Sequence, residues 1–339
     1  MAVNLRDVAR RAGVSTPTAS RVLSGSDYPV APELRERVEQ AARELDYVPN
    51  AQAQALLRGN PRTVGVLVGE VDDPYFSEIV NGIQAVATTH HLLVTICNTK
   101  RDIDRELEYF RLLQAHRTGV VIIAGSGLID DRYTEAMTAR TRSFQQSGGR
   151  VVAIGDPLFD VDRVLVDNAP GARELGAHLV GLGHRDVAML AGAANVASTV
   201  ERVAGLREAV ERAGGTLHVR HGSPTRDGGW SGAAEVLAAH PEVTALVGSA
   251  DQMAIGALAH LRAQGRAVPG EVSVAGFNDI AIAKDLEPSL TTVRLPLQEM
   301  GRSALELATT PAPDEEYLVR TLATELVVRR STAAARDRA

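Results

Sequence analysis

Residues 15–21 carry the side chains whose types and spacing suggest a specific chemistry most clearly. The polar set in this stretch comprises Ser15, Thr16, Thr18, Ser20 and Arg21, with Pro17 among them. On a helix these residues point outward, because Ala19, Val22 and Leu23 form the opposite, buried side. Hydroxyl groups and a guanidinium at a helix N-terminus suit a groove edge lined by phosphates. The pattern therefore predicts contact with a polyanion.

The local charge supports the same prediction. Through Gly25 the chain carries four arginines and one acid, namely Arg6, Arg10, Arg11, Arg21 and Asp7. The whole chain of 339 residues has a formal net charge of −6. A small basic patch on an acidic protein indicates a local polyanion contact rather than general stickiness. From pattern alone, an ordinary surface helical hairpin remains the alternative.

Three short helices are expected to position these side chains. The first ends at Gly13, because glycine adopts the left-handed conformation at little cost. Ser15 is a good N-cap for the second helix, and Pro17 falls in its first turn, where a missing N–H costs nothing. A third helix opens at Pro32. The residues at helical spacing are Leu5, Val8, Ala9 and Ala12 in the first helix, and Leu34, Val38, Ala41 and Leu45 in the third.

Composition limits the class of protein. The length allows two or three domains, and the hydrophobic content of 45% with 23% charged residues is typical of a globular protein. The single cysteine, Cys97, lies in an apolar run, which predicts a buried, inert thiol and excludes an intramolecular disulfide. No apolar run has the length of a membrane span and the first residues lack a signal-peptide core, so we expect a cytoplasmic protein.

Residues 49–61 separate the helical region from the rest of the chain. They are good helix formers placed between two prolines, and the segment is too short to be a stable helix alone. A plain interdomain linker is one interpretation. The other is a conditional helix, which forms only when a partner or DNA receives its apolar residues.

From Arg62 onward, strand and helix signals alternate. This alternation predicts two doubly wound lobes of parallel strands covered by helices, with ligand sites at the carboxyl ends of the strands. The first series has strands at 63–68, 92–96, 120–124 and 151–154, with helices beginning near Pro74, Ile103 and Asp131. The second has strands at 164–166, 187–190, 217–219, 245–247 and 272–275, with helices beginning near Ala169, Thr199, Gly228, Asp251 and Ile280. A strand at 291–295, a helix at 297–308 and closing strands within 317–328 complete the chain.

Ten short sequence motifs make the chain similar to the lactose/galactose-repressor (LacI/GalR) family of transcription factors. They occur in the order and spacing of that family along nearly the whole chain. The motifs are Asp7-Val8-Ala9-Arg10-Arg11-Ala12-Gly13-Val14-Ser15, Ser20-Arg21-Val22-Leu23, Tyr47-Val48-Pro49-Asn50-Ala51, Asp73-Pro74-Tyr75-Phe76, Val166-Asp167-Asn168, Leu182-Gly183-His184-Arg185, Arg202-Val203-Ala204-Gly205, Ala250-Asp251-Gln252-Met253-Ala254, Val274-Ala275-Gly276-Phe277-Asn278-Asp279 and Leu290-Thr291-Thr292-Val293.

The resemblance implies an all-α helix-turn-helix headpiece (1–48), a hinge helix (49–61) and a core like that of periplasmic sugar-binding proteins (62–339). Three chain crossings would divide the core into an N-lobe of about 62–161 and 291–321 and a C-lobe of about 162–290 and 322–330. The implied activity is that of a bacterial regulator, most simply a repressor. It would bind a pseudo-palindromic operator in double-stranded DNA as a homodimer, under the control of a small effector, expected to be a carbohydrate. The C-terminal tail has no leucine heptads, so we expect no tetramerisation bundle.

DNA contacts follow from the resemblance position by position. Thr16, Pro17 and Arg21 stand where the family reads bases, and arginine can grip guanine through two acceptors at once. Ser15, Thr18 and Ser20 match residues that contact phosphates. In the hinge, Asn50 belongs to the matching motif, and Leu56 matches a leucine wedged into the minor groove. Gln54 and Leu57 depart from the basic or polar residues common there.

The same resemblance implies an effector site between the lobes. Its predicted residues are Tyr75, Phe76, Arg202, Asp251 and Asn278. Core packing is the alternative for Phe76, and capping of the helix that it begins is the alternative for Asp251. Asn278 replaces a frequent aspartate, and an amide can both donate and accept hydrogen bonds. Ala250, Gly155 and Pro224 also depart from frequent effector contacts, so the resemblance does not name the ligand.

Two other functions compete with this interpretation. An enzyme is disfavoured because Gly125-Ser126-Gly127 lacks the third glycine of a dinucleotide fingerprint, and adjacent His90 and His91 cannot form a zinc pair at one-turn spacing. We therefore expect no catalytic residue, no cofactor and no metal site. A free-standing sugar-binding protein is disfavoured by the headpiece.

Overall fold

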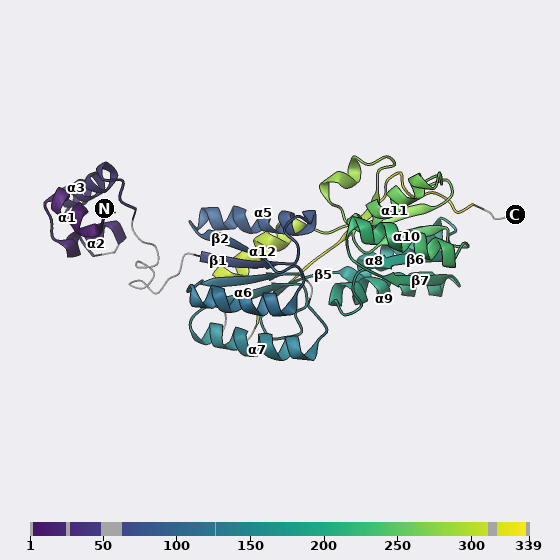
Figure 1. Cartoon of the computed structure of the whole chain (residues 1–339), viewed down its shortest axis with the longest axis horizontal. Coiled ribbons are helices and arrows are strands. Elements are labelled where there is room, and N and C mark those ends of the chain that lie inside the picture. Colours follow the sequence, from purple (N-terminus) through teal and green to yellow (C-terminus); the bar gives the residue numbers. More distant parts are fainter. Residues whose placement is uncertain (1–2, 25–27, 49–62, 126, 311–316, 337–339) are drawn as a thin grey trace. The chain divides into compact units, whose positions relative to one another are not determined.

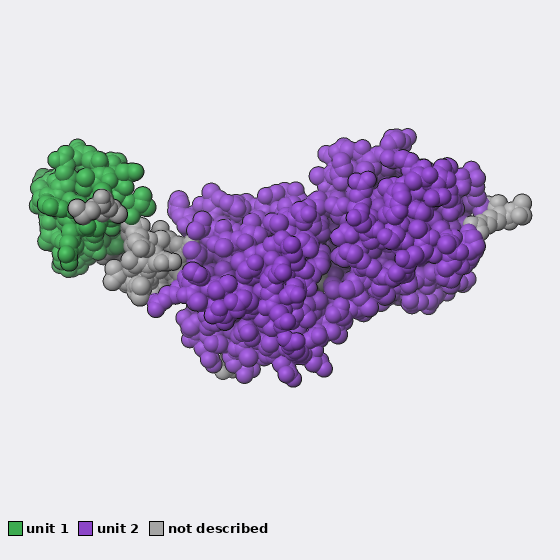
Figure 2. All heavy atoms as spheres, viewed as in Figure 1, with its two compact units in different colours: residues 1–62 green, residues 63–339 purple. Residues whose placement is uncertain are grey.

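The computed structural model describes residues 3–24, 28–48, 63–125, 127–310 and 317–336 (Figure 1). The chain forms two compact units, Met1–Arg62 and Thr63–Ala339, which Figure 2 shows in green and purple. Each unit has its own buried core. The hinge helix predicted over 49–61, including Asn50 and Leu56, lies outside the described residues.

The described residues of the first unit form a bundle of three helices: α1 (Leu5–Ala12), α2 (Thr16–Ser24) and α3 (Pro32–Glu44). Asn4 and Asp7 form a reciprocal capping box at the start of α1, and Gly13 ends this helix with a φ of 64°. The core of the bundle consists of Val8, Ala9, Ala12, Ala19, Val22, Val38, Ala41 and Ala42. The helical headpiece predicted from apolar spacing is confirmed.

The second unit begins with a lobe built on a six-stranded parallel sheet. Its strands are β1 (Thr63–Val68), β2 (Leu93–Asn98), β3 (Val120–Ala124), β4 (Arg150–Ile154), β5 (Asp162–Val166) and β11 (Val319–Leu322), in the order β11-β5-β4-β3-β1-β2. Two helices, α5 (Pro74–Thr89) and α12 (Leu297–Thr309), cover one face. The other face carries α6 (Ile103–Ala115) and α7 (Asp131–Gln146) (Figure 1). We call this part the N-lobe.

The remainder of this unit, the C-lobe, repeats the architecture. Its strands are β6 (Asp186–Ala191), β7 (Thr216–His221), β8 (Ala245–Gly248), β9 (Ser273–Asn278), β10 (Thr291–Arg294) and β12 (Glu325–Val327), in the order β12-β10-β9-β8-β6-β7. Helix α8 (Asn168–Gly181) packs with α9 (Ala197–Arg212), and α10 (Arg226–Ala239) packs with α11 (Asp251–Ala263). A short 3-10 helix, η1, covers Ala281–Lys284. The two doubly wound lobes predicted from the alternation are confirmed, and among the strands of the described residues only β12 is antiparallel to its neighbour.

Strand pairing corrects two of the lobe boundaries that the resemblance implied. Residues 162–166 were expected to open the C-lobe, but β5 pairs with β4 and β11 in the N-lobe sheet. Residues 291–294 were expected in the N-lobe, but β10 pairs with β9 in the C-lobe sheet. Each of these crossings therefore follows a strand instead of preceding it. Sequence periodicity identifies a strand but does not identify its hydrogen-bonding partner, which is why both boundaries were misplaced.

No helix among the described residues is both long enough and apolar enough to span a membrane.

Helices α5 and α12 of the N-lobe pack closely against each other at Gly82 and Gly301. A Cβ atom added at Gly82 of α5 would lie 1.9 Å from the backbone oxygen of Gln298, and one at Gly301 of α12 would lie 2.0 Å from that of Ile79. Because backbone atoms cannot move as a flexible side chain can, the two helices approach this closely only with glycine at both positions.

We predict that Gly82→Ala lowers the free energy of unfolding by about 1–3 kcal/mol, because the added methyl group forces the helices apart. Urea unfolding followed by circular dichroism measures the loss. Gly181→Ala is the matched control, since Gly181 is also helical but a Cβ there meets no atom within 4 Å. Equal stability of the two variants would contradict the close contact.

Candidate functional site

Helix α2 presents the polar face predicted from its sequence. Ser15 lies at the start of the helix, where its Oγ accepts a hydrogen bond from the backbone N–H of Thr18 at 3.2 Å and lies 2.8 Å from the Thr18 hydroxyl. The six residues of the predicted face are all exposed or half-buried, whereas Ala19 and Val22 of the same helix are buried: Ser15, Thr16, Pro17, Thr18, Ser20 and Arg21. The first turn thus faces outward with most of its hydrogen-bonding groups on one side.

Arg21 is positioned by an aromatic ring that the sequence interpretation missed. Its guanidinium carbon lies 4.3 Å from the ring centroid of Tyr28, which follows α2 and is 56% exposed. A guanidinium that stacks on an aromatic face loses less freedom when it forms further hydrogen bonds. The stacking therefore pre-orients the arginine that was predicted to read bases.

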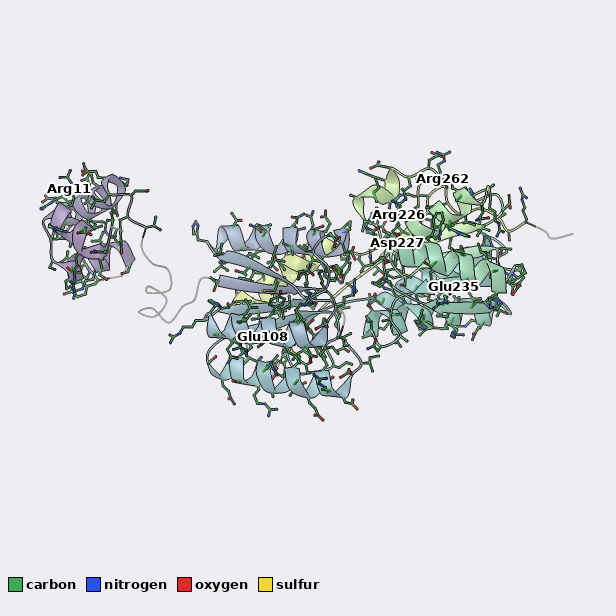
Figure 3. All side chains as sticks on the ribbon, in the orientation of Figure 1. Arg11, Glu108, Arg226, Asp227, Glu235 and Arg262 are labelled. Atoms are coloured by element: carbon green, nitrogen blue, oxygen red, sulfur yellow. The ribbon has the colours of Figure 1, made fainter. Side chains whose placement is uncertain are left out.

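The other arginines of the basic patch are partly neutralised. Arg10 pairs with Asp7, and the Nε atom of Arg11 donates to Glu44 at 2.8 Å. That hydrogen bond from Arg11 is the main reason why the pKa of Glu44 lies below its usual value. Figure 3 labels Arg11 on the headpiece. In the described part of the chain Arg21 has no ion pair, so its charge is free to act on another molecule.

A cavity of about 250 Å³ lies between the lobes of the second unit. Part of its lining comes from positions that directly follow strands. Gly69, Thr99 and Gly125 follow β1, β2 and β3 in the N-lobe, and Gly192 and Ser249 follow β6 and β8 in the C-lobe. Ligands of open parallel sheets bind at these carboxyl ends, as the sequence interpretation expected.

The aromatic pair at the start of α5 forms one wall. Asp73 caps this helix by accepting from the backbone N–H of Tyr75 at 3.0 Å, and Pro74 occupies the first turn. The rings of Tyr75 and Phe76 meet edge to face, with 4.9 Å between centroids, and both line the cavity. Phe76 is only 3% exposed, so it packs in the core and borders the cavity at the same time.

Arg202 is the buried cation of the opposite wall. Its Nε donates to the Oδ1 atom of Asn168 at 2.9 Å, and its Nη1 donates to the backbone oxygen of Ser249 at 2.6 Å. The guanidinium also lies over the Phe277 ring, 4.0 Å from the centroid. Burial lowers the pKa of Arg202 to about 10, which leaves it charged at neutral pH.

Asn278 completes this wall beside Arg202. Its Oδ1 lies 3.5 Å from Nη1 of Arg202, and both residues line the cavity. Asn278 has a φ of 120°, a backbone conformation that non-glycine residues rarely adopt. Such strain persists only where surrounding structure holds it, and it concentrates at binding sites. Among the described residues, Arg202 forms no ion pair with a carboxylate, and its guanidinium is held by neutral groups at the cavity wall.

Asp251 does not belong to this wall, and its predicted effector-binding role is corrected. Its side chain is fully buried and is absent from the cavity lining. One carboxylate oxygen accepts from the Thr292 hydroxyl at 2.6 Å and the other from the backbone N–H of Ile280 at 2.8 Å. These bonds join the start of α11 to β10 and to the segment after β9. Neither of these hydrogen bonds comes from an N–H group of α11, so the capping alternative also fails.

Comparisons with known proteins identify the family. The model described as "Bacterial regulatory proteins, lacI family" matches residues 4–50, and the one described as "Periplasmic binding proteins and sugar binding domain of LacI family" matches residues 61–324. The chain belongs to the LacI family. Its relatives in the comparisons are transcriptional regulators of the helix-turn-helix type.

Three relatives show how far the similarity of this LacI-family chain extends. The regulator GalS of Salmonella typhimurium is 35% identical over 309 residues, which cover 90% of this chain and 89% of GalS. The solved CelR–cellobiose complex is 32% identical with a TM-score of 0.70, over 97% of this chain and 99% of CelR. A Lac repressor dimer bound to operator and the anti-inducer ONPF is 27% identical with a TM-score of 0.84, over 98% and 100%.

The cavity of this LacI-family chain also contains polar residues that the sequence interpretation missed. Arg101 follows β2, lies 5.4 Å from the Phe76 ring centroid and pairs with Asp73 at 3.7 Å. Glu106 accepts a hydrogen bond from the Tyr133 hydroxyl, and burial raises the pKa of both groups. The position of Arg101 in the loop that follows β2 is the signal that could have found it. Glu106 and Tyr133 come from two helices, so no local pattern joins them.

The structural role of Asp251 predicts a specific pH dependence. Burial raises its pKa from 3.8 to about 6, so the folded state binds the proton more tightly than the unfolded state does. Stability is therefore higher below about pH 4 and declines as the pH rises through 6. Relative to Asp251→Asn, the wild-type free energy of unfolding should fall by about 3 kcal/mol over this range.

Urea unfolding of both proteins between pH 4 and pH 7 measures this difference. Asp279→Asn is the control with the opposite sign. Burial alone would raise the pKa of Asp279, but hydrogen bonds from Arg329 and Arg294 lower it overall. A pH-independent difference between wild type and Asp251→Asn would show that the carboxylate meets solvent in the cavity.

Proposed function

We propose that this LacI-family chain is a transcriptional repressor that binds a pseudo-palindromic operator as a homodimer. A small effector, most simply a carbohydrate, binds in the cavity between the lobes and controls the affinity for DNA. The chain acts by binding and not by catalysis, in the bacterial cytoplasm, and it associates with the nucleoid when bound to DNA. The main observation in support is that one chain has both features: an exposed polar face on α2, suited to DNA, and a cavity lined by residues of both lobes, suited to a small ligand.

The proposed DNA contacts divide into two groups. Thr16, Pro17 and Arg21 read base edges in the major groove, and the stacked guanidinium of Arg21 supports this role. Ser15, Thr18 and Ser20 contact phosphates and so fix the register of the helix. Asn50 and Leu56 are proposed to act in the hinge segment, where Leu56 enters the minor groove and kinks the duplex.

The chemistry of the cavity supports a carbohydrate-like effector. Tyr75 and Phe76 offer aromatic faces to an apolar ring surface, while Arg202 and Asn278 offer planar polar groups to hydroxyl or anionic oxygens. The relative CelR was solved with cellobiose. Because Arg202 lacks a carboxylate partner among the described residues, a ligand with acceptor groups such as ring hydroxyls, carboxylate or phosphate would compensate its charge.

Two observations support a homodimer: an exposed apolar edge strand, and the match between a twofold dimer and a palindromic operator. Strand β2 is an edge strand of the N-lobe sheet, with Leu93 66% exposed and Ile96 42% exposed. Apolar side chains on an uncovered edge strand are typical of an interface. Two headpieces in a twofold dimer would match the two half-sites of a palindrome.

The proposed mechanism is linkage between the two ligands. The chain crosses between the lobes after β5, after β10 and after β11, so relative movement of the lobes is transmitted by three connections. An effector that prefers one degree of lobe closure changes the spacing of the two N-lobes in the dimer and thereby the formation of the hinge helices. It can change DNA affinity only by its differential affinity for the two states, about 1–3 kcal/mol.

Selection of bound duplexes from a random DNA pool tests the proposal. The selection is repeated with neutral sugars, sugar acids and sugar phosphates in the buffer. We expect a palindrome without ligand that is lost with one ligand class. The absence of any enriched sequence at low salt would contradict the repressor and favour a free-standing sugar-binding protein.

Substitution of the stacked arginine tests the recognition helix. Arg21→Ala should lower the affinity for the selected operator by about 5- to 150-fold, since a bidentate contact to a base contributes about 1–3 kcal/mol. Fluorescence anisotropy with labelled operator measures the change. Arg43→Ala removes an exposed charge from α3 and should change affinity by less than about threefold, as expected for a single distant phosphate contact. Equal effects of the two substitutions would contradict a reading role for Arg21.

Substitution in the cavity tests the effector site. Asn278→Asp places a carboxylate beside Arg202 and should shift ligand preference toward neutral sugars by about tenfold, because the new charge repels anionic ligands. Isothermal titration with a sugar and its phosphate measures the ratio of affinities. Asp251→Asn should leave this ratio unchanged, since Asp251 does not line the cavity. A shift with Asp251→Asn but not with Asn278→Asp would contradict the proposed wall.

A further inference from the structure

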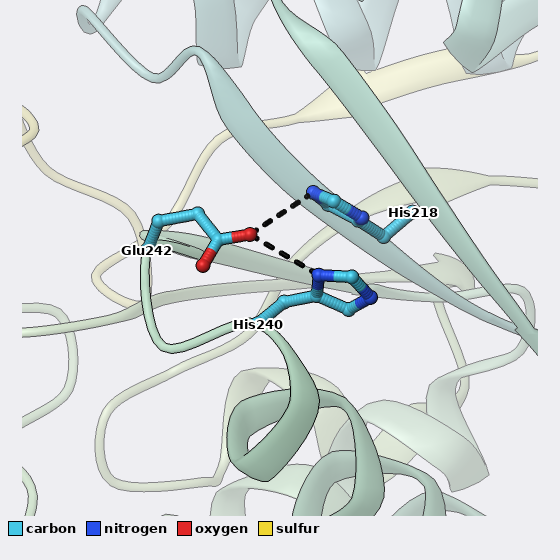
Figure 4. Close-up of side chains that lie close together, drawn as sticks. All are labelled: His218, His240 and Glu242. Atoms are coloured by element: carbon cyan, nitrogen blue, oxygen red, sulfur yellow. Dashed lines mark hydrogen bonds and ion pairs between the residues drawn. The ribbon is translucent and has the colours of Figure 1, made fainter.

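Three side chains converge at the β7 edge of the C-lobe sheet, and none of them is among the residues that line the cavity. His218 belongs to the edge strand β7, His240 ends helix α10, and Glu242 lies in the loop that leads to β8. Figure 4 shows both imidazoles facing one carboxylate oxygen. This cluster has no part in the function proposed above.

The distances within the cluster match those between ligands of one metal ion. Oε1 of Glu242 lies 3.6 Å from Nε2 of His218 and 3.1 Å from Nδ1 of His240, and the three ligand atoms all lie within 4.8 Å of one another. Tetrahedral zinc with bonds of about 2.0–2.1 Å keeps neighbouring ligand atoms about 3.3 Å apart. Small rotations of the side chains would therefore bring all three atoms onto one ion.

One of the imidazoles has an unsatisfied nitrogen that points to such an ion. Nε2 of His218 is buried and has no hydrogen-bond partner in the described part of the chain. Its distance of 3.6 Å from the carboxylate is too long for a hydrogen bond. A buried polar atom without a partner is uncommon, and a bound ion is one of the standard explanations.

The arrangement of the rings also brings both nitrogens to the same side. The centroids of His218 and His240 lie 3.9 Å apart, with a tilt of 31° between the ring planes. Rings stacked in this way present their nitrogens side by side, so one ion can reach both of them.

We propose that His218, His240 and Glu242 form a binding site for a divalent transition-metal ion of the zinc class. Two imidazole nitrogens and one carboxylate oxygen are a ligand set suited to Zn²⁺ and unsuited to Mg²⁺ or Ca²⁺, which prefer oxygen ligands. Water fills the remaining coordination positions, because His240 and Glu242 are about 40% and 43% exposed. The ion joins the end of α10 and its loop to β7 and so stabilises the edge of the C-lobe.

Zinc titration of the full, untagged chain tests this site. The protein is first treated with a chelator, and Zn²⁺ is then titrated in competition with a chromophoric chelator of known affinity. We expect the cluster to take up one Zn²⁺ per chain. Glu242→Gln and His218→Gln should each lower that affinity at least tenfold. Co²⁺ should give the visible absorption of four- or five-coordinate cobalt in the wild type and not in Glu242→Gln or His218→Gln.

His116→Gln is the matched control, since His116 is an exposed histidine that also ends a helix. It should leave zinc affinity unchanged. Glu242 is a half-buried loop residue and glutamine has nearly the same shape, so Glu242→Gln tests the proposal even if His218→Gln fails to fold. No zinc uptake, or uptake that Glu242→Gln retains in full, would overturn the proposal and leave the cluster as two histidine–carboxylate contacts.

Discussion

Parallel strands of one sheet all end on the same side of that sheet. In this chain the carboxyl ends of the parallel strands of both lobes face one cavity. The aromatic pair follows β1, Arg101 follows β2, Ser249 follows β8, and Asn278 ends β9. None of these residues needs to be near another in the sequence, because the strand order brings them together. The cavity, its polar walls and the proposed coupling between lobes all depend on this single geometric constraint.

The charge in the cavity wall gives that geometry its chemical selectivity. Arg202 is held by a side-chain amide, a backbone carbonyl and an aromatic ring instead of a carboxylate. A buried cation held by neutral groups keeps much of its field available to a ligand. Asp251 follows Ser249 by two residues, but its carboxylate accepts hydrogen bonds from Thr292 and Ile280 and so stabilises the fold. Gly276 makes room for it, since a Cβ there would lie 2.2 Å from the carboxylate.

Local signals in the sequence predicted the elements of the fold well. Pro74, Ile103 and Asp131 were expected to begin helices and do so, because each follows an acidic N-cap whose side chain accepts from the first turn. The recognition helix was also predicted correctly, since Gly13 and Ser15 mark a helix end and a helix start. These features are set by neighbours in the chain.

Features set by distant neighbours were not predictable from local patterns. The strand at 164–166 looks the same whether it pairs with β4 or with a C-lobe strand. An aspartate in the first turn of α11 looks the same whether it faces a ligand or Thr292. Tyr28 beside Arg21, Glu106 beside Tyr133, and His218 beside His240 are likewise contacts between elements. Only the folded chain places these groups together.

The central claim is that the binding of DNA and the binding of a cavity ligand are thermodynamically coupled. The most direct test is whether each ligand changes the affinity for the other by the same factor. The affinity of the chain for its effector should be measured with and without saturating operator DNA. Thermodynamic linkage predicts that operator changes effector affinity by the same factor by which effector changes operator affinity, about 5–150-fold. An effector that binds in the cavity with equal affinity in both conditions would contradict the account.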